Sequence, residues 1–136
     1  MINYHYSNET GILLTVTEGS ISVDDIINHY NTLLKSEYLT KKLKVLIDCR
    51  NTKINCRPSQ VENTTKHVKK VLQKFDRLEE AIVVDLPYET AIATLFKNVN
   101  SGYSNYHIKI FVTPEAAMNW LNEPILSEYA EDLPSQ

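Results

Sequence analysis

Two short apolar runs, each followed by an amphipathic segment, restrict most strongly what this chain can fold into. The runs are Leu43–Asp48 and Ala81–Val84, and their apolar residues are consecutive rather than alternating. Such runs are typical of strands that are covered on both faces. Strands that alternate with helices over short connections predict a mostly parallel sheet with right-handed crossovers.

Apolar residues spaced three and four positions apart predict four helices. Their expected starting residues are Ser22, Ser59, Pro87 and Thr113. Ser22 with Asp25, and Ser59 with Glu62, have the spacing of a capping box. Gly102 is expected to end the third helix in a left-handed conformation. The fourth helix is expected to hold Trp120 in the core.

The remaining strands complete a single α/β domain. Residues 2–6 and 12–17 flank a turn and predict an antiparallel hairpin, and residues 107–112 predict the last strand. The expected order is β-β-α-β-α-β-α-β-α over residues 1–122. Residues 123–136 are expected to form an acidic C-terminal tail. The chain has 136 residues, which suits one domain.

The sequence lacks the residue patterns of several common kinds of site. The three glycines form no dinucleotide-binding or P-loop pattern, and no G-x-S-x-G motif occurs. The four histidines are scattered, and His29 and His67 are expected to face solvent. No long apolar run or signal-peptide pattern is present, so we expect a cytoplasmic protein without a transmembrane segment. We identify no catalytic residue and expect no metal and no cofactor.

Cys49 and Cys56 lie seven positions apart, which is neither a CxxC pair nor enough ligands for a structural zinc site. We expect two reduced thiols. A reactive thiol stays open as an alternative, because the neighbouring Arg50 and Arg57 could lower a cysteine pKa.

Charge is distributed unevenly along the chain. The net charge is −3, yet residues 35–77 hold 12 of the 14 basic residues and four of the 17 acidic residues. Lys66, Lys70 and Lys74 form an i,i+4 row, which is either a solvated helix face or a basic patch. A basic patch would suit an acidic partner protein, an anionic ligand or a second copy in a homodimer. Nucleic acid is not expected, because the whole chain is acidic and no aromatic residues interleave with the basic residues of segment 41–74.

The candidate ligand-binding residues gather around the expected loop 49–58. They are Asp48, Arg50, Arg57, Ser59, Asp85 and Tyr88. Asp48 and Asp85 end apolar strands, where ligands of open α/β sheets bind, although each could simply cap the next loop. Arg50 and Arg57 could hold an anion at a helix N-terminus, or only keep the loop soluble. Ser59 serves either as a helix cap or as a phosphorylation site.

Three stretches resemble the SpoIIAA-like group of STAS domains, which is often compared with the CRAL-TRIO lipid-binding fold. They are TVTEGSISVDDI, KVLIDCRN and FVTPEAAMNWL. The resemblance covers about residues 1–122 and implies a STAS-like α/β fold. Antagonists of this superfamily carry a phosphorylated D-S-S-G stretch, where this chain has residues 55–59, NCRPS.

The leading interpretation is a non-enzymatic regulatory or binding module. It would bind a partner protein or a small anionic ligand near loop 49–58. The alternative is a small enzyme or carrier of a lipid or other apolar ligand, with a pocket at the carboxyl ends of the strands that includes Asp48, Asp85 and Tyr88. A sizeable apolar pocket with converging polar groups would favour the second interpretation.

Overall fold

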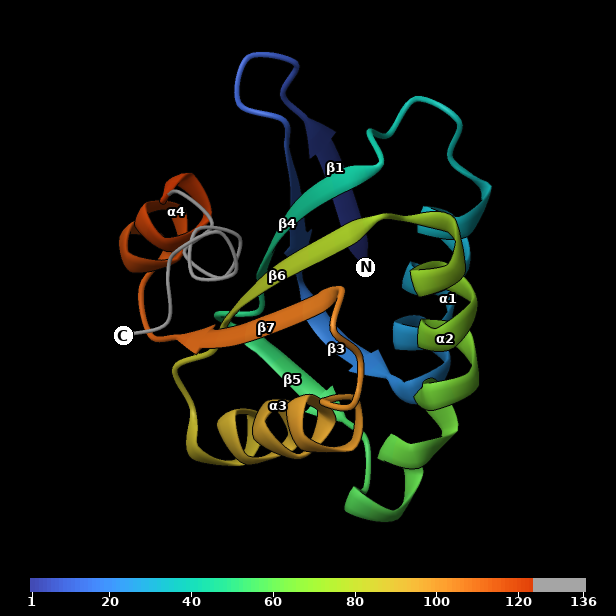
Figure 1. Ribbon diagram of the computed structural model, residues 1–136. Helices are drawn as coiled ribbons and strands as arrows, with labels where there is room; N and C mark the ends of the chain where they lie inside the picture. Colours follow the sequence, from blue (N-terminus) through green and yellow to red (C-terminus); the bar gives the residue numbers. More distant parts are fainter. Residues whose placement is uncertain (124–136) are drawn as a thin grey trace, which may run out of the picture.

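The five predicted strands form one twisted sheet, seen in the computed structural model, which describes residues 1–123 (Figure 1). Their bounds are β1 Ile2–Tyr6, β2 Ile12–Thr17, β4 Lys42–Asp48, β6 Arg77–Val83 and β7 Tyr106–Phe111. The order across the sheet is β1-β2-β4-β6-β7. β1 pairs antiparallel with β2, and every other neighbouring pair is parallel. The predicted mostly parallel sheet with an N-terminal hairpin is confirmed.

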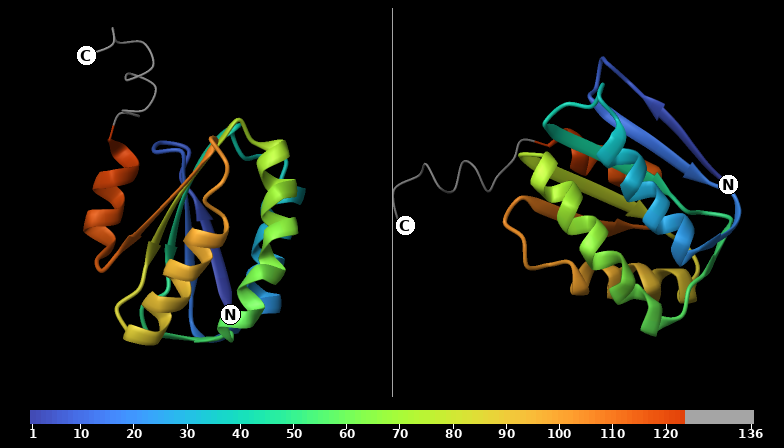
Figure 2. Two further views of the ribbon diagram at one scale, coloured as in Figure 1. Left: turned by 60° about the horizontal axis from the view of Figure 1, so that its bottom comes forward. Right: turned by 90° about the vertical axis from the view of Figure 1, so that its right-hand side faces the viewer.

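The helices divide unequally between the two faces of this sheet. Their bounds are α1 Val23–Lys35, α2 Thr65–Lys74, α3 Pro87–Val99 and α4 Pro114–Asn122, and a 3-10 helix, η1, covers Pro58–Thr64. α1, α2 and α3 cover one face, whereas α4 covers the other (Figure 2). No helix within residues 1–123 is long and apolar enough to cross a membrane.

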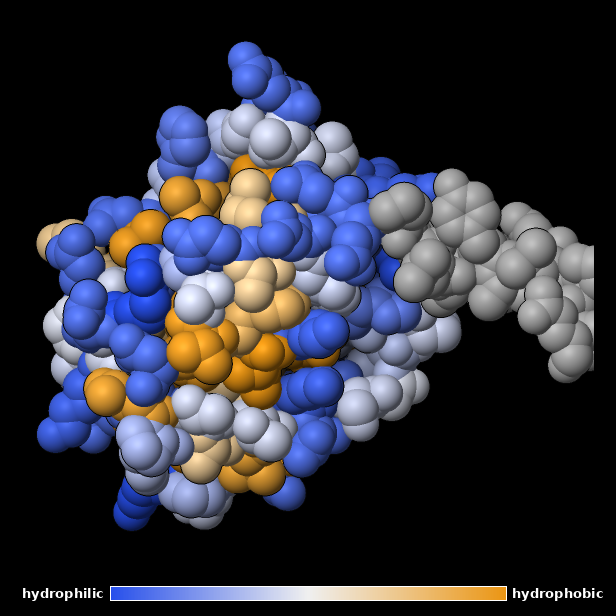
Figure 3. All heavy atoms as spheres, turned by 90° about the vertical axis from the view of Figure 1, so that its left-hand side faces the viewer, coloured by the Kyte–Doolittle hydropathy of each residue, from blue (hydrophilic) through white to orange (hydrophobic). Residues whose placement is uncertain are grey.

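The unequal division produces a large core and a small one. The large core lies between the sheet and α1, α2 and α3, and the small one lies under α4. On the α4 side, hydrophobic side chains reach the surface between hydrophilic ones (Figure 3). Trp120 is among the partly buried residues of this side, with its ring 5.8 Å from that of Phe111. The expectation of a Trp120 in the core is therefore met only in part, because Ala117 and Leu121 occupy the buried face of α4.

A second, two-stranded sheet was not predicted. β3 (Gly19–Ser22) pairs in parallel with β5 (Thr52–Asn55), with Ile21 opposite Ile54. β5 lies inside the segment 49–58 that was expected to be a loop. Each of the two strands places a single isoleucine in the core, so neither carries an apolar run that marks a strand.

Of the two predicted capping boxes, one is confirmed and one is wrong. The Ser22–Asp25 capping box is confirmed by two hydrogen bonds, of 2.8 and 3.2 Å. The Ser59 cap is wrong, because Pro58 occupies the first helical position and moves the cap to Arg57. The backbone N–H of Arg57 donates to Oε1 of Gln60 at 2.9 Å, and Ser59 is exposed within η1.

The expected Gly102 stop is also wrong. α3 ends at Val99, and Asn100 follows as its C-terminal cap. The side-chain amide of Asn100 donates to the carbonyl of Phe96 at 3.0 Å. Because this amide satisfies a carbonyl of the last helical turn, the chain needs no left-handed glycine there.

One lysine of the basic row, Lys74 on α2, forms hydrogen bonds to α1 and does not belong to an open basic surface. Nζ of Lys74 donates to the carbonyls of Leu33 and Leu34, both at 2.9 Å, and to that of Ser36. These carbonyls lie at the C-terminal end of α1, where a cation is favoured. Lys66 and Lys70 remain exposed on α2.

Candidate functional site

The predicted pair Asp48 and Arg50 is joined by its own salt bridge at the end of β4. Nε and Nη2 of Arg50 donate to the two carboxylate oxygens of Asp48 at 3.0 and 2.9 Å, and the backbone N–H of Arg50 adds a third bond. Burial alone would raise the pKa of Asp48, but the hydrogen bonds and charge of Arg50 together hold this pKa below its usual value. The charged groups of the two side chains are therefore already hydrogen-bonded to each other.

Two further carboxylates, those of Glu115 and Asp85, act on this guanidinium through their charge. The hydrogen bond to Asp48 raises the pKa of Arg50 most, and the charges of Glu115 and Asp85 add to that rise. Asp48, Arg50 and Asp85 thus lie near one another at the carboxyl edge of the sheet. Their surroundings are rich in negative charge, which opposes a second anion.

The other predicted residues lie elsewhere. β5 separates Arg50 from Arg57 by four residues of extended chain, about 13 Å. Arg57 and Ser59 are exposed at the start of η1. Tyr88 is 48% exposed in the first turn of α3, and its hydroxyl donates to the carbonyl of Cys56. The structure does not bring these three residues to Asp48. Anion binding by the predicted set stays a prediction.

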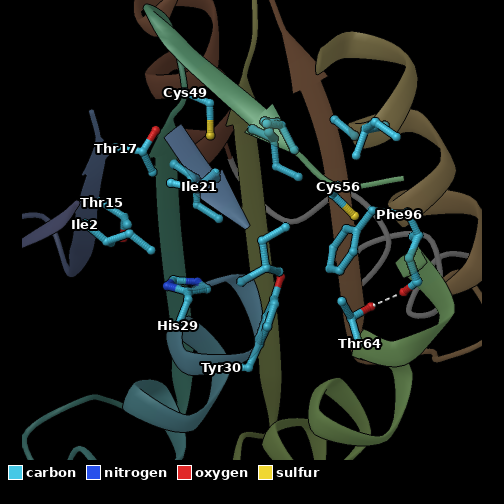
Figure 4. A pocket seen from close by; sticks show the side chains of 17 residues that line it. Ile2, Thr15, Thr17, Ile21, His29, Tyr30, Cys49, Cys56, Thr64 and Phe96 are labelled. Atoms are coloured by element: carbon cyan, nitrogen blue, oxygen red, sulfur yellow. Dashed lines mark hydrogen bonds between the residues drawn. The ribbon is translucent and has the colours of Figure 1, made fainter. Parts of the chain in front are cut away.

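A cavity of about 70 Å³ lies between the sheet and the helical layer. Its walls come from the carboxyl-terminal halves of β2, β4 and β6, from β3 and β5, and from α1, η1 and α3. Most lining side chains are apolar, and Figure 4 shows them converging from both layers. The polar lining residues are Thr15, Thr17, His29, Tyr30 and Thr64, together with Cys49 and Cys56.

Next to this cavity, a carboxylate is buried in the middle of the sheet. Glu80 on β6 has no exposed surface. The hydroxyl of Tyr30 donates to its two oxygens at 2.9 and 3.1 Å, and the hydroxyl of Tyr106 donates to Oε1. Burial first, and then the charge of Glu80, raises the pKa of both phenols well above the usual value. Both tyrosines therefore remain protonated hydrogen-bond donors.

His29 connects this carboxylate to the cavity. Its Nε2 lies 3.7 Å from Oε2 of Glu80, and its Nδ1 lies 2.9 Å from the hydroxyl of Tyr4, whose ring stacks on the imidazole. Only 5% of His29 is exposed, so the expectation that it faces solvent is wrong. His67 is half-buried on α2.

Two buried polar atoms, in residues that border the cavity, have no hydrogen-bond partner within residues 1–123. They are Nε2 of His29 and Oγ1 of Thr15. Unpaired buried polar groups of this kind cost about 1–3 kcal/mol each and are rare in native proteins. In contrast, the hydroxyl of Thr64 donates to the carbonyl of Val61 at 2.7 Å, drawn as a dashed line in Figure 4.

The two thiols of the cavity wall are suited to packing rather than to nucleophilic chemistry. Burial raises the pKa of Cys49 to about 11 and also raises that of Cys56. The open alternative of an activated thiol therefore finds no support, since the thiolate is the reactive form. Residues 1–123 also contain no group of three His, Cys, Asp or Glu side chains that could hold a metal ion.

Sequence reasoning missed this cluster because its members are far apart in the chain. Tyr30 and Glu80 are separated by 50 positions. One signal was present for His29, which lies three positions after Ile26 and four before Leu33, on the apolar face of α1. Glu80 fell outside the predicted strand 81–84, whereas β6 begins at Arg77.

Comparison with known proteins identifies the fold alone. No protein-family model matches the sequence, and no curated protein does. A solved structure from Shewanella loihica PV-4, an uncharacterised protein of the DUF3478 family described as having a SpoIIAA-like fold, has a similar arrangement. The TM-score is 0.57 at 18% identity, over 89% of this chain and 92% of the other. The chain therefore has a SpoIIAA-like α/β fold, as the sequence resemblance predicted.

Proposed function

We propose that this domain is a binding module for a small, mainly apolar molecule, which occupies the cavity between the sheet and the helices. The cavity and its almost wholly apolar lining carry this proposal. It lies toward the carboxyl ends of the parallel strands, where α/β sheets commonly bind ligands. The raised pKa values of the thiols support binding rather than chemistry.

The volume of the cavity limits the size of the ligand. A single water needs about 10–15 Å³ of such space, and an engineered cavity of about 150 Å³ holds benzene. At about 70 Å³, less than half the volume of the benzene-binding cavity, this cavity suits a molecule of roughly three non-hydrogen atoms. A lipid chain is much larger, so we favour a small molecule over a lipid.

A titration with cyclopropane and with xenon, followed by amide and methyl NMR shifts, tests this proposal. We expect saturable shifts confined to residues of the cavity wall. Ala93→Leu introduces a larger side chain from α3 into the cavity and should weaken binding at least tenfold. Ala116→Leu makes the same change at an exposed position of α4 and should leave binding unchanged.

The milder Ala93→Val variant replaces Ala93→Leu if the latter does not fold, with at least a threefold loss expected. Absence of saturable shifts with xenon and with cyclopropane, up to their solubility, would refute the proposal. So would shifts that Ala93→Leu and Ala116→Leu affect equally.

A second candidate function rests on a different observation. The side chain of Arg57 has no hydrogen-bond or ion-pair partner within residues 1–123, and the exposed Lys66, Lys69 and Lys70 follow it on α2. This surface suits an acidic partner protein. Titration with a poly-glutamate peptide should shift residues 57–70, and Arg57→Ala should reduce those shifts while Arg50→Ala does not. Equal effects of the two variants would refute this candidate.

A further inference from the structure

β7 is the last strand of the sheet, and no other strand pairs with its outer side within residues 1–123 (Figure 1). The carbonyls of Asn105, just before β7, and of Phe111, at its end, accept hydrogen bonds at 2.9 and 3.0 Å from the β6 side. Alternate residues of a strand direct their backbone groups to opposite sides. Ile108 and Ile110 therefore direct their backbone N–H and C=O groups outward, where a further strand could pair with them.

An open groove of about 300 Å³ lies along this outer side of β7. Four consecutive residues of β7, 106–109, line it, and their side chains alternate between the two faces of the sheet. The groove is therefore centred on the edge of the strand rather than on one face. Its walls include Lys97 from α3 and Trp120 from α4. We call it the β7 edge groove, and it shares no lining residue with the buried cavity.

The β7 edge groove has positive charge that the described part of the chain does not neutralise. Lys97 and Lys109 line it, and no acidic residue does. Neither lysine has a carboxylate partner within residues 1–123, although Nζ of Lys109 lies 5.6 Å from the centre of the Phe111 ring. A lone lysine on an edge strand commonly protects against pairing with other chains. A second lysine on α3 and a groove beside the strand indicate a negatively charged partner instead.

The side chains of β7 predict the pattern of that partner. Lys109 and Phe111 lie on the α4 side of the sheet, whereas Ile108 and Ile110 lie on the side of the main core. Residues opposite each other in paired strands share a face, and opposite charges or apolar groups stabilise such pairs. A matching strand therefore has acidic residues on the α4 side and apolar residues on the other side.

Two other occupants of the groove fit less well. A second copy pairing antiparallel along β7 would place two Lys109 side chains opposite each other, or each opposite a His107. Neither arrangement pairs opposite charges, and two lysines directly opposite destabilise a sheet. A strand formed by residues 124–136 would follow α4, which covers the face opposite α1, α2 and α3, so it would reach the outer side of β7 by a left-handed crossover. Such crossovers are rare.

We infer that the β7 edge groove binds an extended segment of a partner protein in which acidic and apolar residues alternate. The segment adds to the sheet as a further strand, through the outward backbone groups of Ile108 and Ile110. Its carboxylates lie beside Lys109 and within reach of Lys97 at the other wall. This surface is distinct from the cavity of the proposed function and from residues 57–70.

A short synthetic peptide tests this inference on the full chain. The peptide is Glu-Val-Glu-Val-Glu-Val with blocked ends, and binding is followed by NMR shifts of the protein. We expect saturable shifts at residues 97–101 and 106–111 and at the indole of Trp120. Replacing the three glutamates of the peptide by glutamine should weaken binding at least threefold, and replacing them by lysine at least tenfold.

Methylation of the peptide backbone separates strand pairing from simple attraction between charges. Two peptides are methylated on nitrogen, one at the three valines and the other at the three glutamates. Only alternate N–H groups of an added strand point toward β7. One methylated peptide should therefore bind at least tenfold more weakly, while the other stays within threefold of the parent. Equal affinities of the two would show that charge alone attracts the peptide, and would overturn the inference.

A charge reversal in the protein gives a matched pair of variants. Lys109→Glu should weaken binding of the glutamate peptide at least fivefold and strengthen binding of the lysine peptide. Lys70→Glu makes the same change at an exposed position of α2 outside the groove and should leave both affinities unchanged. Equal effects of the two variants, or shifts centred on residues 57–70, would refute the inference.

Two further outcomes would also refute it. One is the absence of saturable shifts with the parent peptide at millimolar concentration. The other is a shift of residues 106–111 that depends on protein concentration without peptide, which would show that a second copy occupies the edge. None of these results bears on ligand binding in the buried cavity, because the two sites have no lining residue in common.

Discussion

Replacing Tyr30 by phenylalanine tests whether the buried carboxylate depends on its two phenols. The substitution deletes one oxygen and keeps the ring, which stacks on Phe96 with 5.8 Å between ring centres. The deleted hydroxyl donates to both oxygens of Glu80, at 2.9 and 3.1 Å. After the change, Tyr106 is the remaining hydrogen-bond donor to this carboxylate within residues 1–123.

The expected loss of stability follows from these contacts. A hydrogen bond to a charged group contributes about 1.5–3 kcal/mol, and a buried charge left short of donors accounts for much of it. Because the ring packing is retained, little is added for lost apolar contact. We expect the Tyr30→Phe variant to lose about 2 kcal/mol of unfolding free energy, which lowers Tm by about 6–10 °C for a domain of this size.

Urea unfolding monitored by circular dichroism measures this loss. Tyr6→Phe is the matched control, because Tyr6 is half-buried and its hydroxyl has no hydrogen-bond partner in the described part of the chain. It should change the unfolding free energy by less than about 0.5 kcal/mol. If Tyr30→Phe costs no more than Tyr6→Phe, the carboxylate does not depend on this phenol. A Tyr30→Phe, Tyr106→Phe double variant should cost more than the sum of the single changes.

Three further predictions concern other contacts. Lys74→Met should destabilise the fold by about 1–2 kcal/mol in urea unfolding, because it removes charged hydrogen bonds at the end of α1, whereas Lys70→Met on the exposed face of α2 should have almost no effect. Arg50→Gln should cause a small loss of stability at neutral pH. This loss should shrink at acid pH, because the lowered pKa of Asp48 gives stability that is lost as pH falls through that pKa; an unchanged difference across pH 3–7 would contradict this. The thiol of Cys49, whose pKa is raised to about 11, should react with an aromatic disulfide reagent at pH 8 at least tenfold more slowly in the native protein than in urea, and equal rates would show that it is accessible.

The sequence predicted the main sheet well because its signals are local. Consecutive apolar residues in Leu43–Asp48 and the apolar face of residues 23–34 each lie within a single element, and the structure confirms both. β3 and β5 could not be found in this way. Each of them contributes one core residue, Ile21 or Ile54, and pairs with a partner strand more than 30 positions away.

The candidate site was less accessible to sequence reasoning. The sequence pattern places Asp48 and Asp85 at the carboxyl ends of two apolar strands, but only the structure shows that the side chain of Arg50 is hydrogen-bonded to Asp48. The polar cluster behind the cavity depends on the register of β6 and β7, which places Glu80 opposite Ile108 and brings Tyr106 within reach. A pattern within one segment contains no information about such a register.

The buried arrangement around Glu80 has a consequence for the evolutionary history of the chain. If a substitution removes this carboxylate, two buried phenols lose their hydrogen-bond acceptor. If a substitution removes one phenol, the carboxylate loses a hydrogen-bond donor. Intermediate sequences are therefore less stable than either end point. Across homologues, positions 30, 80 and 106 should change together, as a polar trio or as three apolar residues, and this joint substitution would mark which relatives retain the same buried cluster.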